Sequence, residues 1–243
     1  MANILGIIPA RYGSTRFPGK PLIDIGGKSM IQRVYEQSLK STSLKKIIVA
    51  TDDERIAEHV LNFGGEVSIT SSTHQSGTDR CAEVLHNEKG EFDIVINIQG
   101  DEPFINPAQI DLLAVCFDDI EIQIATLIKK IVLEEDIRNP NIVKAIRNFK
   151  NEAIYFSRSP IPYRRNPEAE ISYFKHIGIY GYRSDVLREI TKLPIGNLEK
   201  AESLEQLRWV ENGYRIGVKE TTIESLSIDT PDDLKHVEKY LKN

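Results

Sequence analysis

A loop that directly follows the first apolar run carries side chains suited to binding a triphosphate. It reads Pro9-Ala10-Arg11-Tyr12-Gly13-Ser14-Thr15-Arg16-Phe17-Pro18-Gly19-Lys20-Pro21-Leu22. Cationic donors, hydroxyls and glycines that expose backbone N–H groups all occur in it. The glycine and lysine spacings of a Walker loop or a dinucleotide fingerprint are absent. An exposed basic loop is the alternative, but the position at a strand end favours phosphate binding.

Two turns further along the chain carry aspartates, the first of which could bind a metal ion. Asp101 lies in Gln99-Gly100-Asp101-Glu102-Pro103, after the most apolar run, where a carboxylate can coordinate Mg²⁺ through oxygen. Asp229 lies in Ile228-Asp229-Thr230-Pro231. Taken locally, Asp229 is better explained as the N-cap of the last helix.

A serine- and glycine-rich segment around position 76 precedes a helix that we expect to begin near Thr78. Taken locally, the segment could serve only to cap that helix. Thr78 and Asp79 can supply the cap, however, which leaves Ser76, Gly77 and Arg80 open to bind a ligand.

The elements that position these loops alternate between strand and helix. Short β-branched runs at 4–8, 47–49, 67–69 and 94–98 predict buried parallel strands. Helical patterns cover 29–39 and 53–63. The alternation predicts an α/β fold with a mostly parallel, doubly wound sheet, in which ligands collect outside the carboxyl ends of the strands.

The later part of the chain is less regular. We expect one domain over 1–243, with a small inserted subdomain at about 150–182 that covers the site or forms a dimer contact. A helix over 198–212, a strand near 216 and a helix after Pro231 should follow. On the helix over 198–212, spacing predicts one polar face formed by Glu202, Glu205, Gln206 and Trp209.

Composition excludes several classes of protein. The 31 basic and 36 acidic residues give a net charge of −5, which offers no general attraction for nucleic acid or an anionic membrane. No apolar run is long enough to span a bilayer and no signal sequence is recognised, so we expect a cytoplasmic protein. Cys81 and Cys116 lack the spacing of a metal or redox motif and are expected to be packed, reduced thiols.

Several segments together resemble the nucleotidyltransferases that make CMP-activated acidic sugars, and most closely the family that acts on 3-deoxy-manno-octulosonate (Kdo). The resemblance begins in the loop over 9–22 and continues, in order, through His74-Gln75-Ser76-Gly77-Thr78-Asp79-Arg80, Asn97-Ile98-Gln99-Gly100-Asp101-Glu102-Pro103, Tyr155-Phe156-Ser157-Arg158, His176-Ile177-Gly178-Ile179-Tyr180-Gly181-Tyr182, Leu204-Glu205-Gln206-Leu207-Arg208 and Asp229-Thr230-Pro231.

The resemblance implies a nucleotide-diphospho-sugar transferase fold and a homodimer that takes CTP and Kdo as substrates and Mg²⁺ as cofactor. It implies catalytic roles for Lys20, Arg11 and Asp101, and metal ligation by Asp101 and Asp229. It assigns the nucleotide to Arg11, Ser14, Arg16, Lys20, Ser76, Gly77, Arg80 and Gln99. It assigns the sugar to Arg158, His176, Tyr180, Glu205 and Gln206.

Two alternatives stay open at this stage. One is a cytidylyltransferase for another acidic sugar, such as 8-amino-Kdo or a sialic acid. The other is a nucleotide-binding module without turnover, which would not require a pair of metal-binding aspartates.

Overall fold

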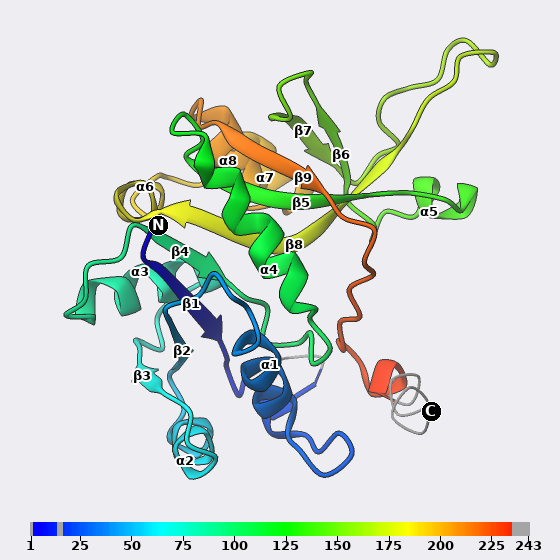
Figure 1. The fold of residues 1–243 in the computed structure, drawn as a ribbon. Coiled ribbons are helices and arrows are strands. Elements are labelled where there is room, and N and C mark those ends of the chain that lie inside the picture. Colours follow the sequence, from blue (N-terminus) through cyan, green and yellow to red (C-terminus); the bar gives the residue numbers. More distant parts are fainter. Residues whose placement is uncertain (1, 14–16, 235–243) are drawn as a thin grey trace. The chain divides into compact units, whose positions relative to one another are not determined.

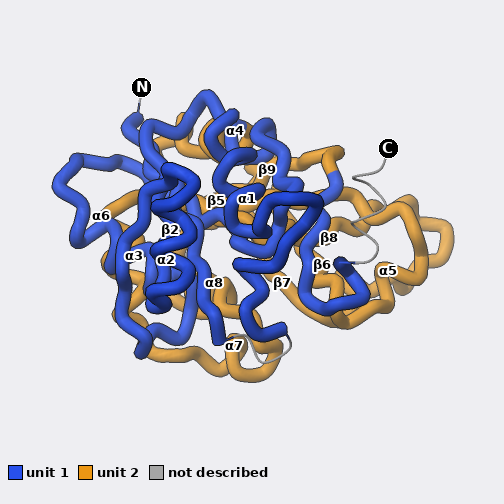
Figure 2. The backbone as a smooth tube through the Cα atoms, turned by 90° about the horizontal axis from the view of Figure 1, so that it is seen from below, with its two compact units in different colours: residues 1–111, 224–243 blue, residues 112–223 orange. Residues whose placement is uncertain are grey.

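The computed structural model describes residues 2–13 and 17–234, and the chain divides into two compact units. The first comprises residues 1–111 and 224–243, and the second comprises residues 112–223, coloured separately in Figure 2. The predicted Ser14 and Arg16, together with Thr15, lie outside the described residues.

The first unit contains a parallel four-stranded sheet. Strand β1 (Ile4–Pro9) lies between β2 (Lys46–Thr51) and β4 (Ile94–Asn97), and β3 (Val67–Ile69) pairs with β2. All four positions of β4 are buried, as are five of the six positions of β1, which explains their continuous apolar sequence. The predicted parallel sheet is therefore confirmed.

Helices alternate with these strands, as Figure 1 shows for α1 (Met30–Ser38), α2 (Glu54–Asn62) and α3 (Gly77–Asn87). Ser29 caps α1 by accepting from the N–H of Gln32 at 3.2 Å, and Asp53 caps α2. Helix α4 (Pro107–Ala114) contains the boundary between the units.

The second unit is built on a mixed sheet. Strand β5 (Ile124–Lys130) pairs antiparallel with β8 (Phe174–Arg183) and parallel with β9 (Ile216–Glu220). Strands β6 (Lys144–Arg147) and β7 (Ala153–Ser157) form an antiparallel pair, and β6 also pairs with β8. The predicted strand near 216 is confirmed. Among the helices of this unit are a 3-10 helix at Val115–Asp118, α5 (Glu134–Arg138) and α6 (Ser184–Ile190).

The single helix expected over 198–212 is wrong. The chain forms α7 (Asn197–Glu202) and α8 (Gln206–Glu211) instead, because Ser203 adopts a left-handed conformation with φ 52° that no α-helix continues through. The expected polar face does not form either, since Gln206 and Trp209 are buried.

Two other expectations about the interior can be compared with the structure. Cys81 and Cys116 are buried and unpaired with each other, as predicted for packed thiols. Within residues 2–13 and 17–234, none of the helices has both the length and the apolar character to cross a membrane.

Candidate active site

Lys20 lies between two aspartates from distant parts of the first unit. Its Nζ donates to Asp101 Oδ2 at 2.9 Å and to Asp229 Oδ1 at 3.2 Å. The Lys20 side chain is 14% exposed, against 27% for Asp101 and 38% for Asp229. The two aspartates are thus close enough to share one cation, and they are exposed enough for a ligand to reach them.

The loop that carries Lys20 is closed by Gly19. Gly19 adopts φ 73° and donates its N–H to the Tyr12 carbonyl at 2.9 Å, after which Lys20 begins a short 3-10 helix at Lys20–Leu22. A Cβ at position 19 would lie 3.2 Å from the Tyr12 ring. The guanidinium of Arg55 lies 3.4 Å from the centroid of that ring. The Tyr12 ring therefore helps to hold the loop in the conformation that directs Lys20 at the carboxylates.

A backbone hydrogen bond brings the two aspartate loops together. The N–H of Ile228 donates to the Asp101 carbonyl at 2.9 Å. Ile228 is fully buried with Ile25 and Met30, and Phe17 packs against the same cluster. Apolar packing therefore fixes the residue next to Asp229.

Thr230, rather than Asp229, caps the last helix. The Thr230 hydroxyl accepts from the N–H of Asp233 at 3.3 Å, and Asp233 Oδ2 accepts from the N–H of Thr230 at 2.8 Å. Residues 231–234, the described part of this helix, are helical as predicted. The Ser/Thr-x-x-Asp pattern of Thr230 to Asp233 was the available sequence signal for this capping box. The Asp229 carboxylate is directed at Lys20 instead.

Glu102 follows Asp101 but is buried, with only 6% of its surface exposed. Burial, and secondarily the nearby charge of Asp101, raise the pKa of Glu102 to about 7, while a hydrogen bond from Ser225 acts in the opposite direction. The two neighbouring carboxylates therefore differ in environment, and the more exposed Asp101 is the better ligand for an ion.

A pocket of about 200 Å³ lies beside the end of β1 in the same unit. It is lined by Pro9, Ala10, Arg11, His74, Gln75, Ser76, Gly77, Arg80 and Gln99. Ligand pockets of about 300 to 1,000 Å³ hold drug-sized molecules, so this one suits a single ring with part of a ribose. It brings together five of the residues predicted to bind the nucleotide.

The start of α3 forms one wall of this pocket. Ser76 is the N-cap: its hydroxyl accepts from the Asp79 N–H at 3.1 Å, and Asp79 Oδ2 accepts from the Ser76 N–H at 3.2 Å. The helix thus begins at Gly77, next to the predicted start, and Asp79 takes part in the cap as predicted, but Ser76 and not Thr78 is the N-cap. A Cβ on Gly77 would lie 3.3 Å from Pro9, so glycine permits the close approach of this turn to β1.

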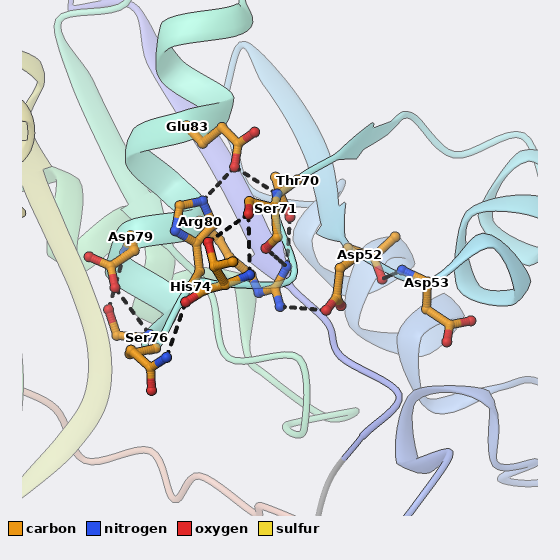
Figure 3. A network of polar contacts seen from close by, with 12 residues as sticks. Asp52, Asp53, Thr70, Ser71, His74, Ser76, Asp79, Arg80 and Glu83 are labelled. Atoms are coloured by element: carbon orange, nitrogen blue, oxygen red, sulfur yellow. Dashed lines mark hydrogen bonds and ion pairs between the residues drawn. The ribbon is translucent and has the colours of Figure 1, made fainter.

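Arg80 lines the pocket but is largely buried, and it is held by other loops of the unit (Figure 3). Its guanidinium donates to Thr70 Oγ1 at 2.7 Å and lies 3.1 Å from Asp52 Oδ2. A further hydrogen bond reaches the Ser71 carbonyl at 3.3 Å. Arg80 therefore ties together the segments that follow β2 and β3, and its contact with a nucleotide remains a prediction.

His74 belongs to the same network. Its Nε2 pairs with the Glu83 carboxylate, which also accepts from the Ser71 N–H at 2.9 Å, as Figure 3 shows. The hydrogen bond from Ser71, together with the one from His74, lowers the pKa of Glu83. This pairing holds His74 at the edge of the pocket.

In the second unit, His176 lies on β8 in a neutral form. Burial lowers the pKa of His176 to about 3. Thr126 Oγ1 lies 3.0 Å from His176 Nε2 and within reach of the carbonyls of Ile177 and Ile179. Since Thr126 has one proton and carbonyls only accept, we assign the imidazole hydrogen to Nε2.

Tyr180 packs next to His176, and Trp209 packs against Tyr180. The Tyr180 ring lies 5.2 Å from the imidazole and 5.1 Å from the Trp209 ring, between centroids. Burial raises the pKa of Tyr180 well above its usual value, and the charge of Glu205 acts in the same direction. Gln206 is buried on the same helix as Trp209. His176 and Tyr180 therefore lie in one aromatic cluster, and Glu205 and Gln206 lie at the start of α8, the helix that carries Trp209.

The fifth predicted sugar ligand, Arg158, is hydrogen-bonded to other residues of the protein. Its guanidinium donates to the carbonyls of Glu202 at 2.7 Å and Pro140 at 3.0 Å. The Glu202 carboxylate accepts from the Arg158 N–H at 2.8 Å and the Ser157 hydroxyl at 2.6 Å. Glu202 is therefore a structural anchor for Arg158, and substrate binding by Arg158 remains a prediction.

The donor set around Lys20 fits a magnesium ion. Two carboxylates that already share a cation offer oxygen ligands of the kind that Mg²⁺ takes from proteins, with water and phosphate completing its coordination. No cluster of three or more His, Cys, Asp or Glu side chains suited to a metal occurs in the part of the chain that the structure describes. Asp101 and Asp229 are therefore the candidate metal ligands. They do not belong to a closed site in which protein side chains supply every ligand.

Comparison with known proteins defines the class first. Residues 5–221 match the family model described as cytidylyltransferase. The 4-diphosphocytidyl-2C-methyl-D-erythritol synthase of Anaerococcus prevotii, at 14% identity and a TM-score of 0.65 over all of this chain and 99% of that one, shares the fold.

Closer similarities narrow the class. The 3-deoxy-manno-octulosonate cytidylyltransferase of Bacteroides thetaiotaomicron is 55% identical over 99% of both chains, and that of Fusobacterium nucleatum is 51% identical over 99% of this chain and 97% of its own. A solved CMP:2-keto-3-deoxy-manno-octonic acid synthetase complexed with CTP matches with a TM-score of 0.94 and 45% identity, over 99% of both chains. The chain belongs to the 3-deoxy-manno-octulosonate cytidylyltransferase family, as the sequence motifs predicted.

Proposed function

We propose that the protein transfers CMP from CTP to the anomeric hydroxyl of Kdo and releases pyrophosphate. The observation that carries this proposal is the bridging of Asp101 and Asp229 by Lys20, in the unit that also contains the 200 Å³ pocket. Membership of the family and the CTP complex of the similar synthetase support the choice of nucleotide.

The charges around Lys20 suit a triphosphate once a metal ion binds. Two carboxylates and one ammonium carry a net charge of −1, and a divalent cation makes it +1. Mg²⁺ held by Asp101 and Asp229 would supply a Lewis acid that lowers the pKa of the attacking hydroxyl and neutralises charge on the α-phosphate.

Lys20 and Arg11 act on the leaving group. The Lys20 ammonium has three N–H donors, two of which are directed at the carboxylates, so the third can donate to a phosphate oxygen. Arg11 is exposed at the wall of the pocket and can pair with the phosphates. Both cations stabilise the charge that develops on pyrophosphate as the bond to the α-phosphorus breaks. Arg16 and Ser14 are assigned to the same phosphates by family likeness.

The nucleotide and acceptor are assigned to different residues. Ser76, Gly77, Arg80 and Gln99 are assigned to the nucleoside, because all four line the pocket. His176, Tyr180, Glu205 and Gln206 are assigned to the sugar, with Arg158 for its carboxylate. The neutral His176 and the apolar faces of the aromatic cluster suit a sugar, which presents hydroxyls and C–H groups together.

The test is pyrophosphate release from CTP with Mg²⁺ and one acceptor at a time: Kdo, 8-amino-Kdo or a sialic acid. We expect release with Kdo, matched mole for mole by a CMP-Kdo product detected by mass spectrometry. Release with one of the other acceptors but not with Kdo would transfer the function to that sugar. Binding of CTP without release with any acceptor would identify a nucleotide-binding module.

A homodimer in the cytoplasm is also expected and stays a prediction. Size-exclusion chromatography with light scattering, which should report twice the chain mass of 27.5 kDa, tests the dimer.

A further inference from the structure

The ends of strands β2 and β3 bring two oxygen-bearing side chains to one edge of the parallel sheet. Thr51, the last residue of β2, pairs with Ile69, the last residue of β3. The Thr70 N–H donates to the Thr51 carbonyl at 2.9 Å, which continues the pairing by one residue. Asp52 and Thr70, the residues that follow the two strands, therefore leave the sheet at the same level.

The guanidinium of Arg80 contacts both of these side chains, as Figure 3 shows. Its Nη1 donates to Thr70 Oγ1 at 2.7 Å and to the Ser71 carbonyl at 3.3 Å, which uses both protons of that nitrogen. Its Nη2 forms an ion pair with Asp52 Oδ2 at 3.1 Å. The Nε–H takes part in none of these contacts, which leaves a donor for a ligand in the pocket that Arg80 lines.

The position of Arg80 is electrostatically unfavourable without a carboxylate beside it. Arg80 is only 4% exposed, and burial of a charged guanidinium is costly unless the charge is paired. It is also the fourth residue of α3, where the positive end of the helix dipole disfavours a cation. The carboxylate of Asp52 offsets both effects.

The pocket therefore contains two guanidinium groups with different electrostatic environments. Arg11 is exposed at the pocket wall and carries its full charge toward a ligand, which suits phosphates. Arg80 and Asp52 together carry no net charge. A buried, neutralised guanidinium suits the uncharged nucleoside, which offers carbonyl, ring-nitrogen and hydroxyl acceptors.

We propose that Asp52, assisted by Thr70, is a positioning residue for nucleotide binding: it fixes the Arg80 guanidinium and cancels its charge, so that Arg80 donates to the nucleoside rather than to the phosphates. The inference rests on the proposed function for the placement of the nucleoside in this pocket. Without the Asp52 carboxylate, the Arg80 charge is uncompensated, and the guanidinium moves toward water or toward the triphosphate.

The test measures nucleotide binding without turnover. Isothermal titration calorimetry of the full-length protein follows CMP and CTP separately, with Mg²⁺ and without an acceptor sugar. Asp52→Asn keeps the shape of the side chain and removes its charge. It should weaken CMP binding about tenfold or more, the factor that corresponds to one hydrogen bond from a charged group.

The comparison of the two nucleotides shows which part of the ligand Arg80 contacts. CMP and CTP share the nucleoside, so Asp52→Asn should weaken the binding of both by the same factor. Arg11→Gln should instead weaken CTP binding more than CMP binding, because CTP carries two more phosphates.

A double-mutant cycle shows whether Asp52 acts through Arg80. In an Arg80→Met background, Asp52→Asn should change CMP affinity by less than about twofold, because the group that Asp52 positions is already absent. Thr70→Val removes the other side-chain acceptor and keeps the ion pair, so it should weaken CMP binding about two- to tenfold. Thr70→Val decides the question if Asp52→Asn does not fold.

Glu54→Gln is the matched control. Glu54 is an exposed acidic residue two positions after Asp52, and its neutralisation should leave the binding of both nucleotides unchanged. Thermal unfolding without ligand checks that each variant is folded.

Four results would overturn the proposal: wild-type CMP affinity in Asp52→Asn, or in Thr70→Val where Asp52→Asn does not fold; equal weakening in Glu54→Gln; a larger loss for CTP than for CMP in Asp52→Asn; or an undiminished effect of Asp52→Asn in the Arg80→Met background. Pyrophosphate release from CTP and Kdo by a protein whose CMP affinity does not depend on Asp52 would reject this inference alone. CMP binding that depends on Asp52, without release with any acceptor, would reject the proposed function alone.

Discussion

Lys20 and Asp101 meet across 81 positions of the chain, with Nζ and Oδ2 at 2.9 Å. Each follows a different strand of the parallel sheet, and the carboxyl ends of such strands lie at one edge of the sheet. This topology explains why a lysine in one loop and a carboxylate in another form one site.

Replacing Lys20 with methionine should lower kcat by about 10²- to 10³-fold, as loss of a preorganised charge at a reacting group commonly does. Steady-state pyrophosphate release from CTP and Kdo measures the change. Lys28→Met is the control, because Lys28 forms an exposed ion pair with Glu36 and has no assigned role. A Lys20→Met enzyme with the rate of Lys28→Met would remove Lys20 from the mechanism.

Thr230→Ala should lower the free energy of unfolding by about 1 kcal/mol, because it removes an N-cap. Asp229→Asn should instead lower turnover and leave helix capping intact, since Asp229 contacts Lys20. Urea unfolding and pyrophosphate release, measured on both variants, separate the two roles. If Asp229→Asn caused the larger loss of stability, Asp229 would be the capping residue after all.

Gly100→Ala should destabilise the first unit by about 1 to 3 kcal/mol, as overpacking does. A Cβ at position 100 would lie 2.6 Å from the Pro9 carbonyl oxygen, which is backbone and cannot turn away. Gly13→Ala is the matched control, because no atom lies within 4 Å of the added Cβ. Equal unfolding free energies for the two variants would show that the turn relaxes freely.

The free energy of unfolding should decrease as the pH is lowered, because of His176. Its pKa is about 3 in the folded protein and 6.5 in a solvated chain, so the unfolded state takes up more protons. The contribution of neutral His176 to the free energy of unfolding is therefore complete above pH 6.5, and it is lost as the pH falls towards 3. At pH 5 the loss is about 2 kcal/mol, from 1.4 kcal/mol per pH unit.

His176→Gln should remove this dependence. Unfolding free energies of the variant and the wild type should converge between pH 7 and pH 5, because only the wild type loses the contribution. Parallel curves over that range would mean that His176 is protonated at little cost in the folded protein.

Much of the fold could be predicted from the sequence because its signals are local. The buried strands around Ile8 and Ile96 are continuous apolar runs, and Ser29 and Asp53 stand at helix starts. The break at Ser203 was not predictable in this way, since a left-handed serine has no strong sequence signal and the helical spacing continues across it.

The site was partly predictable for the same reason. Asp101 follows a buried strand, which placed it at the edge of the sheet. The pairing of Arg80 with Asp52 depends on two loops meeting in space, so no local pattern indicated it.

The central claim is that Asp101 and Asp229 bind the ion that the reaction needs. The most direct measurement is the initial rate of pyrophosphate release from CTP and Kdo by Asp101→Asn over a range of Mg²⁺ concentrations, with the exposed Asp118→Asn as control. We predict a rate at least about 100-fold below the wild type at every Mg²⁺ concentration, and no loss in Asp118→Asn. A wild-type rate and a wild-type Mg²⁺ dependence in Asp101→Asn would contradict the account.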